Sequence, residues 1–593
     1  MMYESNSHTT SDLLTQRIAQ LSPAKRAALQ QRLNARRRHG ADLTAEALQQ
    51  CGVTHLYGVA GLPTQSVLPA AAGQGIRPIG VYHQSSAVCM ALAQNYQAGR
   101  LAAAALVSAG PAVTNAMTGL LVARDNGWPV IVLGGQNSSF QQLNAFSALT
   151  QLTKHAVHVS ESSAIGRCIH DAARIAVSGR PGPVYVELHE DVLARCAVNT
   201  PVPEAIPERT SVAAPTASDA DMKKIAAALL SARRPALLLG KGVRWTVAPS
   251  ELRRLVERLA LPLITSPMGR GFVPDDHALC FNRARPLVQS QADVVLVLGA
   301  RLNWVFRHGA ELAREATVFR VDIDPVPEDD TAVKTQVIRG DAGDFVRRLM
   351  RFVDSCLDDA AAAERQRVMG PWLEELRAAS KETQRWLDRQ TCSDCRPMST
   401  YRMMKEVRRA LPRNAICVTE GHISMLAAQA VIPAFRPAAR MDAGANGCMG
   451  VGIPFAIGAK VACPNRPVVA VVGDYGFSLS AMELEVCLRH KIAVVVIVAN
   501  NQGNCGAIKQ KTLFQADDAE RVAMFQSGIE YDRIMKMFGG AGTTITDPNT
   551  LKDAVMTAIA SGTPSCINVV VDPDAPQPAA WGEQVAIGEE SEG

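Results

Sequence analysis

Two apolar runs separated by a polar segment stand out between residues 468 and 505. Val468 to Val472 and Ile492 to Ala499 are continuously apolar, as in strands of a parallel sheet that are buried on both faces. Between them Gly473-Asp474 ends the first run, and Ser480 can cap a helix that begins near Ala481. The pattern therefore predicts one βαβ unit.

The same alternation of strand-like runs and helical periodicity recurs over most of the chain. It occupies three stretches, with predicted bounds at residues 39–198, 219–350 and 398–573. Such alternation predicts three α/β domains, each a doubly wound parallel sheet. A Pro/Ala/Ser-rich linker and a charged helical connector separate them. A helical N-terminal extension at 1–38 and a tail at 574–593 complete the expected organisation.

Composition excludes several classes of protein. The 593 residues are 47% hydrophobic and 20% charged, with a net charge of +5, which is too small an excess to indicate nucleic-acid binding. We expect no membrane partner and a cytoplasmic protein, because neither a membrane-spanning run nor a signal-peptide pattern is seen. The 14 cysteines follow no framework, as expected of reduced thiols, and the pair Cys392 and Cys395 is interpreted as part of a linker.

Polar residues follow both strands of the opening unit. Because parallel strands end at a common edge, Asp474 and Asn500-Asn501 are expected side by side there. Carboxylate, amide and backbone oxygens suit Mg²⁺, which keeps further positions for phosphate oxygens. The Gly-rich residues 444–452 can bring backbone N–H groups close to a diphosphate.

This stretch resembles the motif of thiamine-diphosphate (ThDP) enzymes, Gly-Asp-Gly followed some two dozen residues later by Asn-Asn. The sequence here is Gly473-Asp474-Tyr475 and Asn500-Asn501, with Tyr475 in place of the glycine at the third position of the motif. The resemblance implies that Asp474, Asn501 and the Gly503 carbonyl hold Mg²⁺, and that Gly473 and Tyr475 lie at the cofactor. A nucleotide-binding or purely structural βαβ unit is the alternative.

Other segments resemble the acetolactate synthase superfamily of ThDP enzymes. GVTHLYGVAG and AGPAVTNAMTGLLVARDNGWPVIVLGGQ match its pyrimidine-binding domain, so the three domains are expected to be the pyrimidine-binding, middle and diphosphate-binding domains. Gly299 to Trp304 is similar to the branch of 2-hydroxyacyl-CoA lyase and oxalyl-CoA decarboxylase. In that branch the middle domain can hold ADP, which implies roles for Arg301 and Asp322. Alternatively, Arg301 pairs with an acid in an unliganded domain, or FAD fills the site.

The resemblance also assigns the residues around the cofactor. Met425 is the candidate buttress under the bent cofactor, and Met449 and Gly450 would flank the pyrimidine. Relatives carry a catalytic Glu at the start of a first-domain helix, where this chain has Gln84. Glutamine donates a hydrogen bond but does not exchange a proton at neutral pH. Three interpretations stay open: a reaction that tolerates slow cofactor activation, assistance from His83 or His422, or a catalytically idle ThDP-binding subunit.

We therefore expect a ThDP- and Mg²⁺-dependent lyase or carboligase that breaks or forms a C–C bond next to a carbonyl, most similar to 2-hydroxyacyl-CoA lyase. An acetolactate-synthase-like enzyme acting on a 2-oxo acid is the alternative, because Gln502 to Cys505 lacks the tyrosine of the CoA branch. Expected partners are a 2-oxo acid, aldehyde or acyl thioester, and further copies of the chain in a dimer or tetramer. The sequence LSPAKRAALQQRL resembles helical linkers of nonribosomal peptide synthetases, which would add a carrier protein as a partner, but a solvated packing helix is the favoured interpretation.

Overall fold

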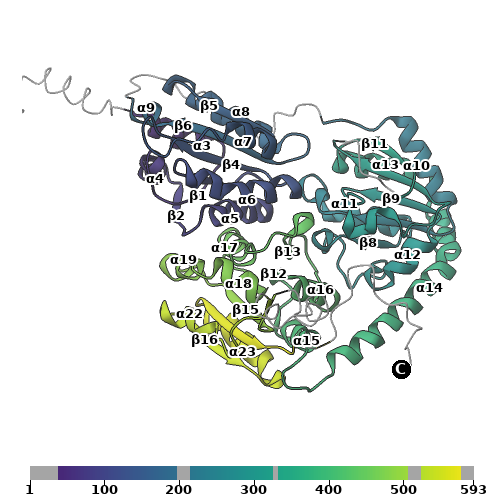
Figure 1. The fold of residues 1–593 in the computed structure, drawn as a ribbon. Coiled ribbons are helices and arrows are strands. Elements are labelled where there is room, and N and C mark those ends of the chain that lie inside the picture. The colour runs from purple at the N-terminus through teal and green to yellow at the C-terminus, as the bar shows by residue number, and fades with distance from the viewer. Residues whose placement is uncertain (1–37, 196–213, 325–331, 505–522, 574, 576–593) are drawn as a thin grey trace, which may run out of the picture.

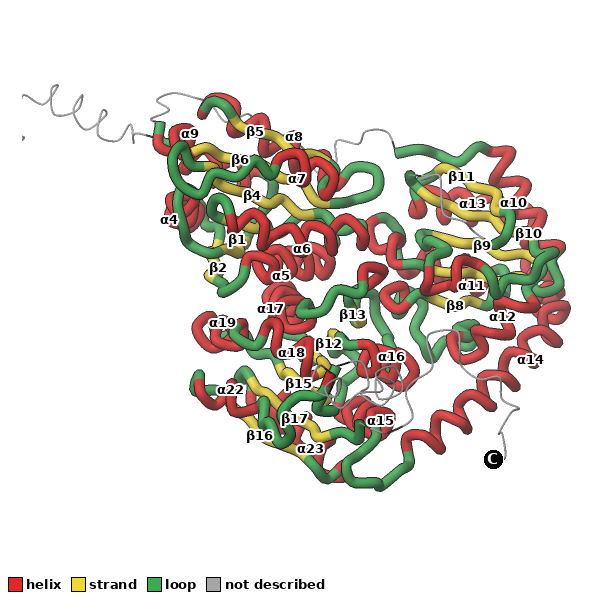
Figure 2. Tube along the Cα trace, viewed as in Figure 1, coloured by secondary structure: helices red, strands yellow, loops and turns green. Residues whose placement is uncertain are grey.

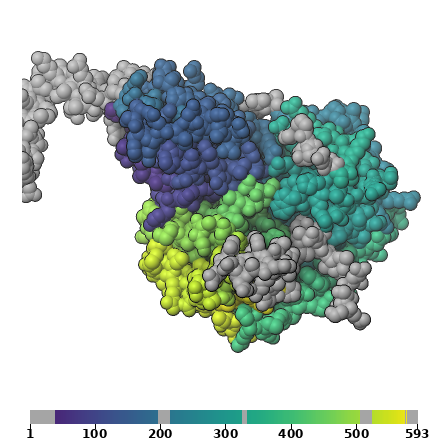
Figure 3. All heavy atoms as spheres, viewed as in Figure 1, coloured from purple at the N-terminus to yellow at the C-terminus, as the bar shows by residue number. Residues whose placement is uncertain are grey.

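Three parallel sheets, each in a domain of its own, make up the computed structural model of the chain. The structure describes residues 38–195, 214–324, 332–504, 523–573 and 575. In Figure 1 the first domain runs from purple to blue, the middle domain is teal and the third runs from green to yellow, and Figure 3 shows the three in contact with one another. The predicted fold class is confirmed. The N-terminal segment, Cys505 and nearly all of the tail lie outside the described residues, and no described helix is long and apolar enough to cross a membrane.

The first domain is a six-stranded sheet in the order β2-β1-β3-β4-β6-β5. All of its strand pairs are parallel, and helices lie on both sides of the strands (Figure 2). Its elements are α3 (Gly40–Gln50), β1 (His55–Gly58), α4 (Val67–Gly73), β2 (Arg77–Gly80), α5 (Gln84–Ala98), β3 (Ala103–Val107), α6 (Pro111–Asn126), β4 (Val130–Gln136), α7 (Phe146–Leu152), β5 (His155–Val159), α8 (Ile165–Val177), β6 (Pro183–His189) and α9 (Glu190–Ala194).

The third domain repeats this topology, with the order β13-β12-β14-β15-β17-β16. Its elements are α15 (Thr400–Ala410), β12 (Ile416–Thr419), α16 (His422–Val431), β13 (Arg440–Asp442), η7 (Gly444–Asn446), α17 (Gly452–Ala462), β14 (Val468–Gly473), α18 (Asp474–Ser480), α19 (Glu483–His490), β15 (Val495–Asn500), α22 (Asp532–Met537), β16 (Ala541–Ile545), α23 (Pro548–Ser561) and β17 (Ser565–Val570). Strand for strand, β1 corresponds to β12 and β3 to β14, so α5 corresponds to α17.

One prediction in this region is only partly right. A helix does begin near Ala481, since α19 starts at Glu483, but its N-cap is Met482 and not Ser480. The sequence analysis missed α18, which begins at Asp474 with Gly473 as its N-cap. A short break separates α18 from α19. The side chain of Phe477 in α18 is fully buried, so the chain forms a helix directly at the end of β14.

Helices α5 and α17 join the first and third domains through one hydrophobic core. Trp128, which follows α6, stacks on Tyr96 of α5 at a centroid distance of 4.4 Å and lies 5.4 Å from Phe455 of α17. Gly458 lets the two helix backbones approach, because a Cβ at this position would overlap with the Met90 carbonyl oxygen. The two domains are therefore held in a fixed relation to each other.

The middle domain is a five-stranded sheet in the order β11-β10-β9-β7-β8. Its elements are α10 (Asp219–Ser231), β7 (Pro235–Leu239), α11 (Pro249–Arg258), β8 (Leu263–Thr265), α12 (Arg285–Gln291), β9 (Val294–Leu298), β10 (Thr317–Asp322), β11 (Thr335–Arg339) and α13 (Ala342–Cys356). The long helix α14 (Asp359–Thr391) then leads along the outside of the molecule to the third domain (Figure 1).

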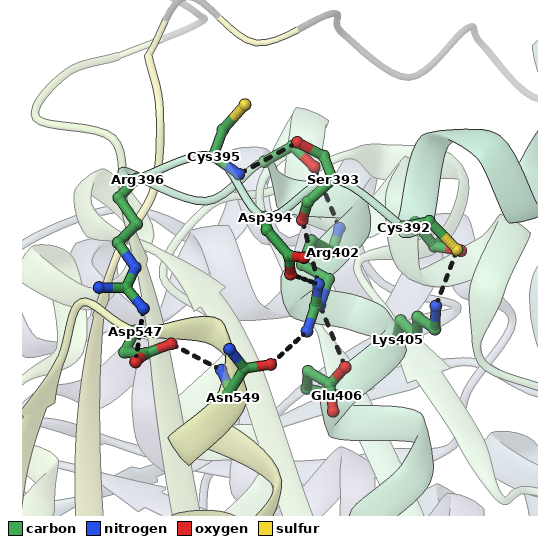
Figure 4. Close-up of polar contacts among 12 residues, drawn as sticks. Cys392, Ser393, Asp394, Cys395, Arg396, Arg402, Lys405, Glu406, Asp547 and Asn549 are labelled. Atoms are coloured by element: carbon green, nitrogen blue, oxygen red, sulfur yellow. Dashed lines mark hydrogen bonds and ion pairs between the residues drawn. The ribbon is translucent and has the colours of Figure 1, made fainter.

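The segment after α14 is fixed by one buried arginine. Arg402 of α15 donates to the Ser393 carbonyl, to Asn549 at 2.9 Å and to Glu406 at 3.1 Å (Figure 4). In Figure 4 the side chains of Cys392 and Cys395 point in different directions, and Cys392 lies 3.2 Å from the Lys405 ammonium group. These contacts describe a structural linker.

We predict that Gly458→Ala lowers the thermal unfolding midpoint by about 2 °C or more, because forcing α17 away from α5 costs about 1–3 kcal/mol. Calorimetry of the whole protein measures this shift. Gly73→Ala is the control, since nothing lies within 4 Å of a Cβ there. An unchanged midpoint for Gly458→Ala would show that the helix contact is not required.

Candidate active site at the carboxyl edge of the third sheet

The three residues predicted to bind a metal lie together at one edge of the third sheet. Asp474 follows β14, and Asn501 follows β15, its neighbour in the sheet. The Gly503 N–H donates to Asp474 Oδ2 at 3.1 Å. The Asn501 amide lies 3.3 Å from Asp474 Oδ1 and 3.0 Å from the Gly503 carbonyl oxygen.

This cluster has the chemistry of a hard-cation site. With its nitrogen turned inward, the Asn501 amide donates to both neighbouring oxygens. Turned the other way, it adds a third oxygen to those of Asp474 and Gly503, and this set suits Mg²⁺. Burial raises the pKa of Asp474 to about 6, against the opposing effect of N–H groups that include those of Tyr475 and Gly503. A bound cation favours the ionised form of this carboxyl group.

Two helix N-termini meet beside the cluster. Helix α16 begins at His422 after Gly421, and a Cβ on Gly421 would lie 3.3 Å from the Gly473 backbone nitrogen, where α18 begins. Helix N-termini bind anions because their first N–H groups have no partner within the helix. His422 is exposed and Tyr475 is half-buried, with its ring stacked 6.3 Å from that of Phe525. The edge therefore offers a cation site and amide donors for a diphosphate.

The Gly-rich loop before α17 adopts backbone angles that favour glycine, with φ of +67° at Gly444 and Gly447 and +84° at Gly450. The Gly450 and Gly452 N–H groups both donate to the carboxylate of Glu420, which follows β12 and is 1% exposed. Burial raises the pKa of Glu420 to about 7, and the two N–H groups oppose this effect. Sequence reasoning missed Glu420, although an acid directly after an apolar strand is the pattern that revealed Asp474.

The two predicted methionines lie in different surroundings. A Cβ on Gly476 of α18 would lie 3.3 Å from Met449 Cε, which places Met449 beside the helix that starts at Asp474. Met425 of α16 lines a cavity shared with the middle domain. Met449 therefore lies beside α18, and Met425 lies in the first turn of α16.

Gln84 and His83 lie at the N-terminus of α5. Gln84 is the first residue of the helix, and its Oε1 accepts from Asn115 Nδ2 at 3.1 Å. The ring of His83 accepts from the Ser85 N–H at 3.1 Å, while its backbone N–H donates to Glu483 of α19 at 3.0 Å. Within the described residues, the hydrogen bonds of Gln84 and His83 do not include Asp474, Asn501 or Gly503.

The cavity that Met425 lines also contains both residues predicted for a nucleotide. Arg301 lies shortly after β9, and Asp322 is the last residue of β10. Lys241 and Arg180 line the same cavity, and sequence reasoning missed both. Burial lowers the pKa of Lys241 to about 7, with Arg301 and Arg180 adding to this and Asp442 opposing it. Arg301 donates to the Asp125 carbonyl at 2.6 Å, and Asp322 pairs with Arg320 at 2.9 Å. Arg180 and Arg301, together with Lys241, whose charged form a bound anion would favour, suit a phosphorylated ligand.

The fold and this edge define a class of protein, the three-domain enzymes that bind a diphosphate cofactor between two related α/β domains. Family models give the same result, matching the N-terminal TPP binding domain of thiamine pyrophosphate enzymes at residues 38–158, their central domain at 222–349 and their C-terminal TPP binding domain at 420–569. The chain belongs to the thiamine pyrophosphate (ThDP) enzyme family.

Its relatives include enzymes of the expected branch. The chain is 31% identical to 2-hydroxyacyl-CoA lyase of Arabidopsis thaliana over 90% of its length and 95% of that protein. It is 29% identical to oxalyl-CoA decarboxylase of Escherichia coli, over 90% of the chain and 95% of that protein. It is also 29% identical to a probable acetolactate synthase of Mycobacterium bovis, over 91% of the chain and 97% of that protein. The resemblance seen in the sequence is confirmed.

We predict that Asp474→Asn weakens Mg²⁺ binding in the presence of ThDP about 100-fold or more, because the cluster of Asp474, Asn501 and Gly503 loses its carboxylate. Titrating Mg²⁺ against protein and ThDP, with intrinsic fluorescence as the signal, measures this. Asp532→Asn removes another aspartate that is 1% exposed, and its Mg²⁺ dependence should match that of the native protein. Equal Mg²⁺ dependence in Asp474→Asn would place the metal elsewhere.

Proposed function

We propose that the protein is a ThDP- and Mg²⁺-dependent lyase or carboligase that breaks or forms a C–C bond next to a carbonyl, similar to 2-hydroxyacyl-CoA lyase. The observation that carries this is the convergence of Asp474, Asn501 and the Gly503 carbonyl beside two helix N-termini. When bound, ThDP supplies a carbon that adds to the donor carbonyl and stabilises the resulting carbanion.

Each part of the third domain has a place in this proposal. Asp474, Asn501 and Gly503 hold Mg²⁺, and the N-termini of α16 and α18 receive the diphosphate. Met449, beside Gly476, is better placed than Met425 to support the bent cofactor, and Gly450 follows it in the same loop. Met425 instead belongs to the middle-domain cavity.

A second copy of the chain completes the site. Gln84 accepts a hydrogen bond from Asn115 of α6 and, within the described residues, has none with the Asp474 cluster, so we infer that the pyrimidine of a ThDP molecule on the third domain meets the first domain of another copy. Three large apolar side chains close in sequence to Gln84 or Asp474 are 46–51% exposed, namely Tyr82, Leu479 and Met482. We infer a homodimer as the smallest active form, which also allows a tetramer.

The substrate class follows from the relatives and from Gln84. A 2-hydroxyacyl-CoA or another acyl thioester is the first donor to test, and a 2-oxo acid such as pyruvate is the second, given the acetolactate-synthase-like relative. A non-catalytic ThDP-binding subunit is a second candidate function, because the Gln84 amide cannot exchange the proton that a carboxyl group would. A carrier protein as partner rests on residues outside the described ranges.

We predict that Gln84→Glu raises the rate of C2 proton exchange of bound ThDP about 10²–10⁴-fold, since the carboxyl group restores general acid–base assistance. Exchange into deuterated water, followed by NMR after acid quench with Mg²⁺ present, measures the rate. A rate equal to that of the native protein would mean that Gln84 does not face the cofactor. His83→Gln and His422→Gln in the native background test whether either histidine assists.

The rate of C2 proton exchange in the native protein distinguishes between the two candidate functions. Exchange on a catalytic timescale, followed by conversion of a CoA thioester or of pyruvate, supports the enzyme. Negligible exchange that Gln84→Glu restores, with no turnover of either donor by the native protein, favours the ThDP-binding subunit.

The middle-domain cavity is the proposed site of ADP, with Lys241, Arg180 and Arg301 toward the phosphates. We predict that Arg301→Ala weakens ADP binding about 10–100-fold through the loss of a charge-assisted hydrogen bond. Isothermal titration with ADP measures this. Arg307→Ala, which removes an exposed ion pair with Glu311 in the same domain, is the control. Equal affinities in the two variants would exclude Arg301 from the site, and FAD is tested in the same way.

A further inference from the structure

Glu420 is a buried acid that no role above uses. Its carboxylate accepts hydrogen bonds from two alternate residues of the Gly-rich loop, Gly450 to Oε1 and Gly452 to Oε2. Glycines also surround it, because a Cβ on Gly476 would overlap with Oε1 and a Cβ on Gly452 would lie 2.6 Å from Oε2. The backbone is therefore built closely around this one carboxyl group.

The contacts of Glu420 connect two parts of the cofactor site. Gly450 follows Met449 in the loop expected beside the pyrimidine, while Gly476 is the third residue of α18, which begins at Asp474. A Cβ on Gly476 would lie close to both the Glu420 carboxylate and Met449 Cε. One carboxylate at the end of β12 thus joins the pyrimidine loop to the helix of the metal ligand.

We propose that Glu420 is a positioning residue whose carboxylate form holds the loop of Met449 to Gly452 against α18, so that ThDP is bound at its pyrimidine and diphosphate ends in one fixed geometry. The proposal rests on the ThDP site described above. An ionised carboxylate accepts both N–H groups, whereas a protonated one carries a donor on one oxygen and loses one of the two bonds.

This role makes ThDP affinity depend on pH near neutrality. Burial raises the pKa of Glu420 to about 7, so its carboxylate is present above this pH and is lost as the pH falls. The neighbouring titratable groups are the thiols of Cys448 and Cys89, which burial keeps protonated, Glu483 near Cys89, and Asp474 and Tyr475 on α18. If only the carboxylate form binds, affinity falls about tenfold between pH 8 and pH 6.

The test is ThDP binding by the whole protein at saturating Mg²⁺, measured by fluorescence at pH 6 and pH 8 for native protein and Glu420→Gln. We expect the variant to bind at least about tenfold more weakly than native protein at pH 8, and this difference to shrink at pH 6. The ratio of the ThDP affinities of the two proteins is compared at each pH, because the titrations of Asp474 and of ThDP itself affect both proteins equally. Glu485→Gln, which removes an acid of α19 paired with Arg489, should bind like native protein at both pH values.

Two results would overturn the role of Glu420: equal affinity of Glu420→Gln and native protein at pH 8, or a ratio that is the same at both pH values. Gly476→Ala decides the matter if Glu420→Gln does not fold. It keeps the acid but displaces it, so weaker ThDP binding supports the proposal and native affinity contradicts it. Absence of ThDP binding by native protein at pH 8 would instead overturn the proposed function, and the role of Glu420 with it.

Discussion

The register between β14 and β15 is the constraint on which the site depends. Gly473 pairs with Ala499 in this parallel ladder, so the residues that come next on the two strands leave the sheet at the same level. Asp474 and Asn501 meet there because each follows its strand directly. A shift of one residue in this register would turn every side chain of the shifted strand to the opposite face and would separate Asp474 from Asn501.

The sequence predicts this part of the molecule well because the information is local. Two apolar runs and the polar residues after them suffice to predict the βαβ unit and the proximity of Asp474 to Asn501. Helix α18 was missed because it depends on the burial of Phe477, which the local pattern does not reveal. Lys241 was missed because its role arises from a cavity contributed by distant segments, whereas Glu420 follows an apolar strand directly, as Asp474 does, and the same local pattern could have revealed it.

The repeated topology of the first and third domains shows how one fold divides a task. In the third domain the strands β12 and β14 are followed by the buried acids Glu420 and Asp474. The corresponding strands β1 and β3 of the first domain are followed by Val59 and Ser108. The third domain therefore carries the charged groups of the proposed cofactor site, and the first offers the amide of Gln84 at the start of α5. This division explains why the buried acids, and not Gln84, dominate the pH dependence expected of binding.

The middle domain contacts both of its neighbours through the walls of its cavity. Arg301 donates to the Asp125 carbonyl of the first domain, and the Trp304 indole donates to the Ala445 carbonyl of the third at 3.0 Å. Ala445 belongs to the Gly-rich segment that leads to Met449 and Gly450. A ligand that binds between these groups stabilises the arrangement of domains in which they are close, since binding to one conformation shifts the population toward it. The Trp304–Ala445 hydrogen bond is the contact through which a ligand in this cavity would affect the loop of Met449 and Gly450.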